Sequence, residues 1–178
     1  MQEAVDLALQ YTPFPATVCG YLCPNLCMQN CSRKIVDLPP LDISMLGKAS
    51  LEAKDPEPLP STGKKIAVIG GGVAGLSVAW QLWMKGHEPT IFERRKKLGG
   101  KITETIPRNR IPDEIVEHEI NRLTKHIRRV HFNSVMTREK FDKLKNEFDF
   151  VVIASGATQP RLLKVPGIEK AIAALDFL

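Results

Sequence analysis

The stretch KIAVIGGGVAG, residues 65–75, decides the fold of this chain. Residues 66–69 form an apolar and largely β-branched run, which is typical of a strand buried in a parallel sheet. Gly70, Gly72 and Gly75 follow at the glycine positions of the G-x-G-x-x-G pattern, which leads from a strand into a helix in dinucleotide-binding domains. The sequence therefore predicts a strand, a tight turn and a helix whose N-terminus faces a pyrophosphate.

Each of the three glycines has a separate mechanical role in this pattern. Gly70 permits the tight turn after the strand, and Gly72 leaves no Cβ between the backbone and the pyrophosphate. Gly75 allows the helix to pack closely against the strand. The pattern alone is weak, because a glycine-rich turn between a strand and a helix can also bind nothing. The residues that follow decide between the two interpretations.

The spacing downstream favours a nucleotide site. Ala79 and Leu82 lie on the helix face that must pack against the sheet, and Gly86 is typical of the position just beyond a helix C-terminus. A second strand is predicted over residues 89–93. Glu93 ends this strand, where its carboxylate can accept hydrogen bonds from the ribose hydroxyls of an adenosine.

Composition and charge narrow the class of protein. The chain has 178 residues, of which 43% are hydrophobic, and no apolar stretch approaches the length of a membrane span. The N-terminus lacks the basic and then apolar order of a signal peptide, so we expect a cytoplasmic protein. Residues 1–60 carry four Lys or Arg against seven Asp or Glu, a net charge of −3, so residues 61–178 carry +8 and the whole chain +5. The basic runs there lack interleaved aromatic residues, and neither a nucleic acid nor a membrane is expected as a partner.

The proline and glycine distribution predicts three regions. Residues 1–36 are expected to form a mostly helical or irregular arm, which starts with a short amphipathic helix over residues 3–10 and carries every cysteine. Residues 37–63 are rich in proline and predict an extended linker. Residues 64–178 are expected to form a nucleotide-binding domain of class α/β, with a Rossmann-like order of strand, helix and strand.

Beyond the second strand the pattern continues as alternating helices and strands. Residues 102–110 predict a loop, and Asp113 is expected to cap a helix with apolar residues at helical spacing. Thr137 is expected to cap a second helix. The predicted elements are a strand at residues 130–135, a helix at 138–148 and a buried strand at 149–154. This last strand ends at Ser155-Gly156, a second position where backbone can contact a ligand.

The four cysteines occur at every fourth residue, as Cys19, Cys23, Cys27 and Cys31. Pro24 and Asn25 argue against one continuous helix that carries all of them as a buried stripe. Four thiolates suit an iron-sulfur cluster and also a structural zinc, although the spacing lacks the paired ligands usual for zinc. Inert thiols are the third interpretation. Disulfides are the poorest, because no secretion signal indicates an oxidising compartment.

Five motifs, in this order, resemble the small (β) subunit of glutamate synthase and its relatives. Those relatives include the N-terminal part of dihydropyrimidine dehydrogenase and the NADPH-side subunits of some electron-bifurcating enzymes. The motifs are C-G-Y-L-C-P at residues 19–24 with the two following cysteines, G-G-G-V-A-G-L at 70–76, F-E at 92–93 followed by L-G-G at 98–100, I-P-x-x-R-I-P at 106–112, and V-I-A-S-G-A at 152–157. The resemblance covers most of the chain.

The resemblance implies how the site is used. In that family the glycine pattern binds the ADP half of FAD, Glu93 would hold the ribose, and Arg110 would lie in the loop beside the flavin. Electrons pass from NADPH to FAD and on through two [4Fe-4S] clusters to a partner protein. The implied metal ligands are Cys19, Cys23, Cys27 and Cys31. Together, the pattern and the resemblance give as cofactor-binding residues Gly70, Gly72, Ala74, Gly75, Glu93, Arg94, Gly99, Gly100, Lys101, Arg110, Ala154, Ser155 and Gly156.

The chain departs from that family in three places. The family's first cysteine group is absent, so four cysteines complete at most one cluster. Residues 44–48 lack the glutamine ligand of one relative, and Thr105 stands where a glycine usually precedes the Ile-Pro loop. Residues 174–178 resemble the segment just before the family's NADPH domain. We therefore expect an incomplete FAD domain, whose last strand lies beyond this chain, and weaker retention of FAD.

These observations predict the FAD-binding portion of an NAD(P)H-dependent iron-sulfur oxidoreductase, which passes electrons through FAD to an electron-acceptor protein or a large catalytic subunit. No catalytic side-chain constellation is visible, as expected where hydride chemistry belongs to the cofactor. The alternative is a non-catalytic module whose cysteine arm binds zinc or one cluster and docks a catalytic subunit. A plain NAD-binding dehydrogenase is less favoured, because Gly99-Gly100 follows Glu93 and no substrate domain is recognisable.

Overall fold

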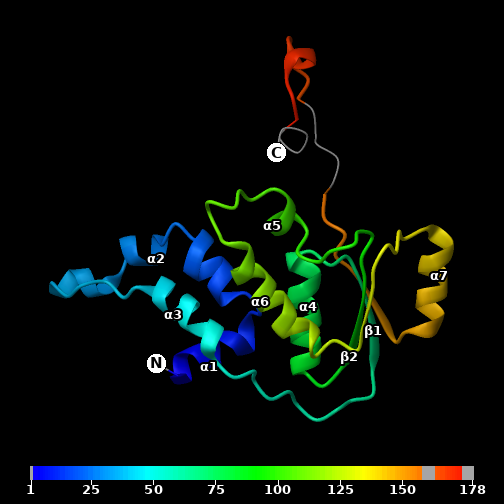
Figure 1. Ribbon diagram of the computed structural model, residues 1–178, viewed down its shortest axis with the longest axis horizontal. Coiled ribbons are helices and arrows are strands. Elements are labelled where there is room, and N and C mark those ends of the chain that lie inside the picture. The colour runs from blue at the N-terminus through cyan, green and yellow to red at the C-terminus, as the bar shows by residue number, and fades with distance from the viewer. Residues whose placement is uncertain (1, 158–162, 174–178) are drawn as a thin grey trace.

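A sheet of four parallel strands lies at the centre of the protein, for which a computed structural model describes residues 2–157 and 163–173 (Figure 1). The described strands stand in the order β3-β2-β1-β4. They are β1 (Lys65–Ile69), β2 (Glu88–Phe92), β3 (Arg129–His131) and β4 (Phe150–Ile153). This order is that of a doubly wound, Rossmann-like sheet, so the predicted α/β class is confirmed.

The first strand is central because its sequence suits burial on both faces. Val68 is fully buried and stands opposite Ile91 of β2 on one side and Val152 of β4 on the other. Parallel strands need crossover helices, and these cover both faces of the sheet. The carboxyl ends of β1, β2 and β4 therefore meet at one edge, where the glycine loop begins.

The helices divide between the two faces of the sheet (Figure 1). On one face, α4 (Val73–Met84) and α6 (Asp113–Thr124) enclose a core that contains Trp80 and Leu123. On the other face, Leu144 of α7 (Arg138–Glu147) packs against Ala67 and Ile69. The predicted helices that follow the glycine pattern and Thr137 are confirmed, and the Thr137 hydroxyl accepts a hydrogen bond from the Lys140 N–H at 3.3 Å.

The N-terminal residues pack onto α4 and α6. The predicted helix at residues 3–10 is confirmed as α1 (Gln2–Tyr11), and the Trp80 indole donates a hydrogen bond to the Leu9 carbonyl at 2.7 Å. The chain then forms a series of short helices. They are η1 (Ala16–Leu22), α2 (Leu26–Gln29), η2 (Ser32–Val36), α3 (Ile43–Ala49) and η3 (Ser50–Glu52).

The proline-rich region is only partly extended. Residues 43–52 form α3 and η3, whereas residues 53–64 contain neither helix nor strand. The helical part lies against η1, and a Cβ built on Gly47 would lie 2.6 Å from the Pro15 carbonyl oxygen and 2.7 Å from the Gly20 nitrogen. The backbones of α3 and η1 thus approach each other closely. The residues in this contact lie far apart in the sequence, so the composition of the region does not reveal it.

Three predicted boundaries also differ from the structure. Asp113 is the first residue of α6 and not its cap, because Pro112 precedes the helix and the Asp113 carboxylate pairs with Arg108 at 2.6 Å. The predicted loop at residues 102–110 begins inside a short helix, α5 (Lys101–Glu104). The strand expected to reach residue 135 ends at His131, because the chain turns at Asn133, where φ is 53°.

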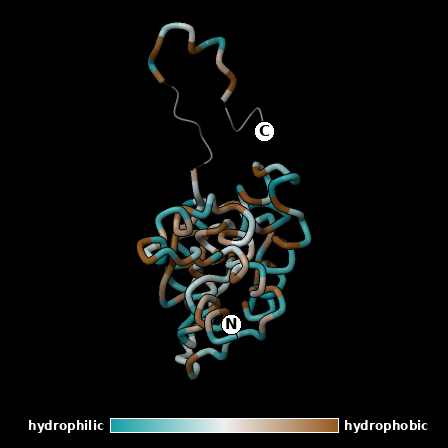
Figure 2. Tube along the Cα trace, turned by 90° about the vertical axis from the view of Figure 1, so that its left-hand side faces the viewer, coloured by the Kyte–Doolittle hydropathy of each residue, from teal (hydrophilic) through white to brown (hydrophobic). Residues whose placement is uncertain are grey.

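Residues 163–173 include the short helix η4 (Ile168–Lys170) and lie apart from the sheet in both views (Figure 1, Figure 2). The resemblance noted for residues 174–178 falls outside the described residues. Within the described ranges, no helix is both long enough and apolar enough to cross a membrane.

Candidate nucleotide-binding site

The glycine loop joins β1 to α4 through two very close contacts. A Cβ built on Gly70, where φ is 108°, would lie 2.4 Å from the Ala154 carbonyl oxygen at the end of β4. A Cβ built on Gly75 would lie 1.9 Å from the Gly70 carbonyl oxygen. No residue with a side chain fits at either position. The roles expected for Gly70 in the turn and for Gly75 in helix packing therefore have a geometric basis.

Gly72 differs from both of these neighbours. A Cβ built there would lie 3.9 Å from the Gly100 Cα, which is an ordinary van der Waals distance, so a side-chain methyl group would fit without a clash. Gly72 also precedes the first residue of α4, a helix of 12 residues. The N–H groups in the first turn of a helix have no acceptor within that helix, and they attract anions. The loop thus combines the donors of a helix N-terminus with a backbone that carries no side chain at Gly72, as a phosphate-binding loop requires.

The predicted second segment lies directly against the first. The Gly99 N–H donates a hydrogen bond to the Gly71 carbonyl at 2.8 Å, and Gly72 and Gly99 form an isolated parallel bridge. A Cβ built on Gly100 would lie 3.0 Å from the Gly72 Cα. The two glycine pairs therefore form one backbone surface, and Lys101 continues from it as the first residue of α5.

Glu93 lies just beyond β2 and points at the glycine loop. Its side chain is buried, with Oε2 accepting a hydrogen bond from the Gly71 N–H at 2.6 Å and Oε1 accepting one from the Arg95 N–H at 2.8 Å. Its backbone also bonds to the segment after β3, because the Glu93 carbonyl accepts from the Ser134 N–H at 2.8 Å. Glu93 therefore holds the glycine loop and the ends of two strands together.

Gly71 is the site residue that the sequence reasoning missed. A Cβ built there would lie 2.3 Å from Leu98 Cδ2 and 3.0 Å from Glu93 Oε2. The signal was present in the sequence, because Gly71 is a glycine at a position that the G-x-G-x-x-G pattern leaves open. The contact with Leu98 could not be predicted, since it depends on the loop after β2.

The remaining predicted residues divide into two groups. Ala74 lies in the first turn of α4, and Ala154 and Ser155 contact the glycine loop near Gly70. The Arg94, Arg110 and Gly156 positions are exposed. Among the described residues, neither arginine side chain makes a hydrogen bond or ion pair with the loop. The structure therefore gathers the backbone surface and Glu93, while Arg94 and Arg110 remain at its margin.

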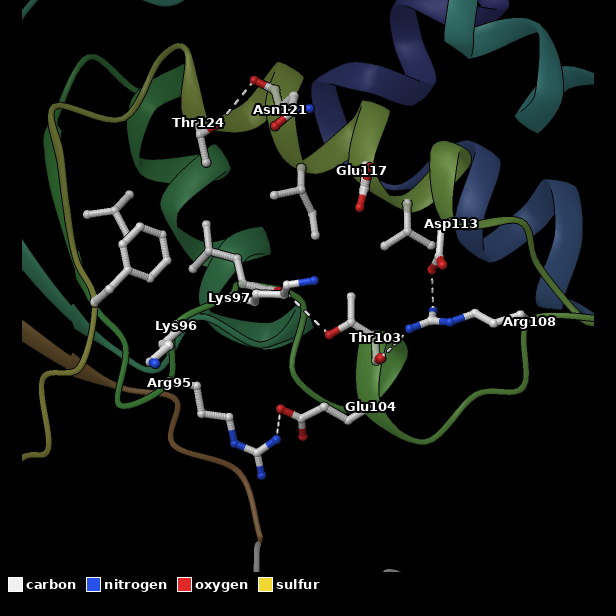
Figure 3. A pocket seen from close by; sticks show the side chains of 15 residues that line it. Arg95, Lys96, Lys97, Thr103, Glu104, Arg108, Asp113, Glu117, Asn121 and Thr124 are labelled. Carbon is white, nitrogen blue, oxygen red and sulfur yellow. Dashed lines mark hydrogen bonds and ion pairs between the residues drawn. The ribbon is translucent and has the colours of Figure 1, made fainter.

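A cavity of about 780 Å³ lies beside the site, between the loop at residues 95–98, α5 and α6 (Figure 3). Its apolar lining comes from Leu98, Val116, Ile120, Val130 and Phe132. Ion pairs cross its rim from Arg95 to Glu104 and from Arg108 to Asp113 (Figure 3). None of the predicted cofactor-binding residues lines this cavity, so it is a neighbour of the glycine loop and not the same site.

The cysteines lie on both sides of a helix interruption at Pro24 and Asn25, as expected. Cys19 lies in η1 and Cys23 just after it, whereas Cys27 lies in α2, beyond Asn25, where φ is 56°. Burial raises the pKa of the Cys19 thiol, and the nearby Cys23 and Cys27 thiols raise it further. These three groups are thus close enough to interact electrostatically.

Cys31 has different surroundings. The backbone N–H groups of Leu41 and Arg33 lower the pKa of its thiol. Within the described part of the chain, no three His, Cys, Asp or Glu side chains converge as a metal site would require. The cysteine side chains as arranged here therefore do not fit a bound zinc ion or cluster without moving.

Comparison with known proteins places this geometry in a family. The sequence profile described as "Pyridine nucleotide-disulphide oxidoreductase" matches residues 64–178, well over half of the chain. The glutamate synthase [NADPH] small chain of Bacillus subtilis (strain 168) is 33% identical over 187 residues, which cover 99% of this chain and 38% of that protein. The NADPH-Fe(3+) oxidoreductase subunit beta of Geobacter sulfurreducens is 29% identical over 191 residues, covering 99% of this chain and 28% of that protein.

A third relative agrees with these two. The glutamate synthase [NADPH] small chain of Mycobacterium tuberculosis is 30% identical over 184 residues, covering 99% of this chain and 37% of that protein. The chain thus spans less than two fifths of the length of these relatives. The resemblance to the glutamate synthase small subunit is confirmed, and this chain belongs to the pyridine nucleotide-disulphide oxidoreductase family.

Proposed function

We propose that this chain is the FAD-binding portion of an NAD(P)H-dependent oxidoreductase, which passes electrons from reduced nicotinamide through FAD to a partner protein. One observation carries the proposal. The Gly70–Gly75 loop, the Gly99-Gly100 pair and Glu93 converge at the carboxyl edge of the sheet, where Gly72 and Gly100 lie against each other with no side chain between them. Family membership and the relatives named as NADPH-dependent enzymes support the same function.

The residues that would hold FAD follow from this geometry. The pyrophosphate would lie against Gly72 and the first-turn N–H groups at Ala74 and Gly75, where no acceptor within the helix competes. Gly99, Gly100 and the Ala154–Gly156 turn would supply further backbone contacts. The positive side chains of Arg94, Lys101 and Arg110 would stand around the anionic ligand.

Glu93 can contact the ribose without giving up its hold on the loop. Each carboxylate oxygen has two lone-pair directions, and each oxygen of Glu93 uses one of them on a backbone N–H. The other direction is available to a ribose hydroxyl. Bound FAD would supply hydride acceptance from the nicotinamide and onward electron transfer, while the protein contributes binding and orientation.

The division of the chain follows the same proposal. Residues 64–178 would form the first part of the FAD- and NAD(P)-binding domain, residues 1–36 the cysteine arm and residues 37–63 the connection that includes α3 and η3. Relatives named as a small chain and as a subunit beta support a partner protein that receives the electrons, either an electron acceptor or a large catalytic subunit. We further propose a cytoplasmic location.

Ligand competition tests the proposal. The purified chain is titrated with FAD while flavin fluorescence is recorded. The titration is repeated in the presence of ADP, FMN or NAD⁺ as a competitor, and FMN is also titrated alone. A grip on the ADP half predicts that ADP competes with FAD and that FMN, which lacks ADP, neither binds nor competes. Equal binding of FMN, or binding of NAD⁺ in preference to FAD, would contradict the proposed site.

The runner-up function is a non-catalytic module that holds zinc or one [4Fe-4S] cluster through Cys19, Cys23, Cys27 and Cys31 and docks a catalytic subunit. The thiols of Cys23 and Cys27 both raise the pKa of Cys19, which favours this function, although all four side chains would have to converge on the metal. Metal analysis of the anaerobically purified chain tests this function. Zinc or iron that is lost in Cys23→Ser supports it, and a metal-free chain that binds FAD contradicts it.

A further inference from the structure

Glu119, near the middle of α6, is a fully buried carboxylate that neither the glycine pattern nor the cysteine spacing indicated. Its Oε1 accepts a hydrogen bond from the Ala16 N–H at 2.7 Å, and its Oε2 accepts one from the Thr17 N–H at 2.9 Å. These donors open η1, the helix that carries Cys19. Since the first N–H groups of a helix have no acceptor within it, Glu119 supplies acceptors from a distant part of the chain.

Arg122, three residues further along α6, holds the other end of the same region. Its guanidinium is 4% exposed and donates to the carbonyl of Ser50 at 2.7 Å and to that of Leu51 at 3.1 Å, in η3. It also pairs with Asp55 at 3.2 Å. Residues 16–53, which we call the cysteine segment, are therefore fixed to α6 at both ends, by a carboxylate at the first helix and by a guanidinium at the last.

The same helix contacts the candidate nucleotide site. Ile120, the neighbour of Glu119, and Val73, at the start of α4, pack against the same buried cluster, and a Cβ built on Gly99 would lie 3.2 Å from Ile120 Cδ1. Tyr21 and Leu22 of η1 belong to the same apolar cluster as Ile120. One side of α6 thus contacts the glycine surface and another side contacts the cysteine segment.

A buried carboxylate is a costly way to fill this position. Removing the charge from water is unfavourable, and that desolvation raises the pKa of Glu119, although the hydrogen bonds from Thr17 and Ala16 and the charge of Arg122 oppose the shift. An apolar residue could pack there at lower cost. What only an acceptor provides is directional bonding to two backbone donors, which fixes where η1 begins.

We propose that Glu119 is a positioning residue, which holds the cysteine-bearing helix η1 at a fixed place relative to the Gly99-Gly100 surface through the Ala16 and Thr17 N–H groups. Any importance of this fixed placement for electron transfer rests on the proposed function, because transfer between a flavin and a group on the cysteine segment requires the two to be held near each other. The positioning itself rests on the contacts of Glu119 alone.

Hydrogen–deuterium exchange of the whole chain, followed by mass spectrometry, tests the positioning role. Glu119→Gln keeps the size of the side chain, but its amide NH₂ turns one acceptor into a donor that faces a backbone N–H. We expect amide exchange in residues 16–22 to accelerate about tenfold, as the loss of a hydrogen bond to a charged group implies. Exchange in residues 65–84 should stay within about twofold of the wild-type rate.

Two further variants keep the test decisive. Glu114→Gln makes the same chemical change at an exposed position of the same helix and should leave exchange unchanged. Glu119→Asp keeps the charge but is one methylene shorter, so it should give an intermediate acceleration even if Glu119→Gln fails to fold. Unchanged exchange in residues 16–22, or an equal increase over the whole chain, would overturn the proposal.

The exchange experiment does not depend on a bound flavin. A chain that fails to bind FAD would contradict the proposed function while the exchange pattern still decides the role of Glu119. Conversely, if the Glu119→Gln variant binds FAD with wild-type affinity and its residues 16–22 exchange faster, the result supports both the proposed function and the positioning role of Glu119. Each failure is therefore distinguishable from the other.

Discussion

The Glu93 carboxylate accepts a hydrogen bond from the Gly71 N–H at 2.6 Å, and this contact joins the end of β2 to the glycine loop. The other oxygen of Glu93 bonds to the Arg95 N–H, so the same side chain also shapes the segment that leads to Gly99. A residue expected only to hold a ribose thus organises the protein side of the site as well.

Glu93→Gln should therefore reduce both stability and ligand binding. The amide keeps one acceptor and places an NH₂ group against a backbone N–H, so we expect a loss of about 1–3 kcal/mol in the free energy of unfolding. Urea denaturation and an FAD titration measure the two effects, with Glu114→Gln as the exposed control. A variant with wild-type stability would show that the bond to Gly71 contributes little.

Gly71 should tolerate substitution by alanine less well than its neighbour Gly72 does. A Cβ on Gly71 would lie 2.3 Å from Leu98 Cδ2, so Gly71→Ala should destabilise the fold by about 1–3 kcal/mol through overpacking. If Leu98→Ala is added, the clash with Leu98 disappears. The double variant should then lose less stability than the sum of the losses in the two single variants. Urea denaturation of the four chains measures this coupling, and strict additivity would contradict the contact.

Arg122 offers a test of the buried end of the cysteine segment. Arg122→Met leaves Asp55 and the Ser50 carbonyl without the guanidinium, and we expect a loss of about 2–3 kcal/mol, reduced from a fully buried pair because Asp55 is 30% exposed. The matched control is Arg128→Met, whose pair with Glu88 is exposed and should contribute less than about 1 kcal/mol. Equal losses in denaturant would refute the difference in burial.

Asp149 should make stability depend on pH in the acid range. The Lys64 side chain, and then the Lys65 N–H, lower the pKa of Asp149 below its ordinary value of 3.8. A lowered folded-state pKa means that the contribution is fully present above the unfolded value and is lost as pH falls through the folded value.

Asp149→Asn removes this titration. Thermal unfolding measured from neutral pH down to about pH 2 should show the wild-type chain more stable at neutral pH, with the difference between the two chains shrinking below the unfolded pKa. A difference that stays constant over this range would mean that the carboxylate is not paired with Lys64 and Lys65 in the folded chain.

The parts of the fold that could be predicted are those coded by local spacing. The run at residues 66–69, the glycines of the loop and the apolar positions of α4 lie within 20 residues of one another, so a strand, a turn and a helix follow directly from their order. The expected convergence of Gly99-Gly100 came from the family resemblance, and the bridge from Gly72 to Gly99 agrees with it.

The parts that could not be predicted depend on contacts between distant residues. Gly47 lies in a proline-rich region whose composition favours an extended chain, yet residues 43–52 are helical and Gly47 lies against the backbone of Pro15 and Gly20. Glu119 is one polar residue among several on α6, and its burial and its hydrogen bonds from the distant Ala16 and Thr17 distinguish it from the others. No periodicity in a single sequence reports such long-range partners.

The most direct test of the central claim is the FAD titration of the wild-type chain beside Gly72→Ala. A Cβ on Gly72 would lie at an ordinary van der Waals distance of 3.9 Å from the Gly100 Cα, so a methyl group should leave the thermal unfolding temperature unchanged. The same methyl group would stand between the backbone and the place proposed for the pyrophosphate. We predict saturable binding of one FAD by the wild-type chain and an affinity at least about tenfold weaker in the variant, roughly 1.4 kcal/mol or more. Equal affinity in both chains, or no binding by the wild-type chain, would contradict the account.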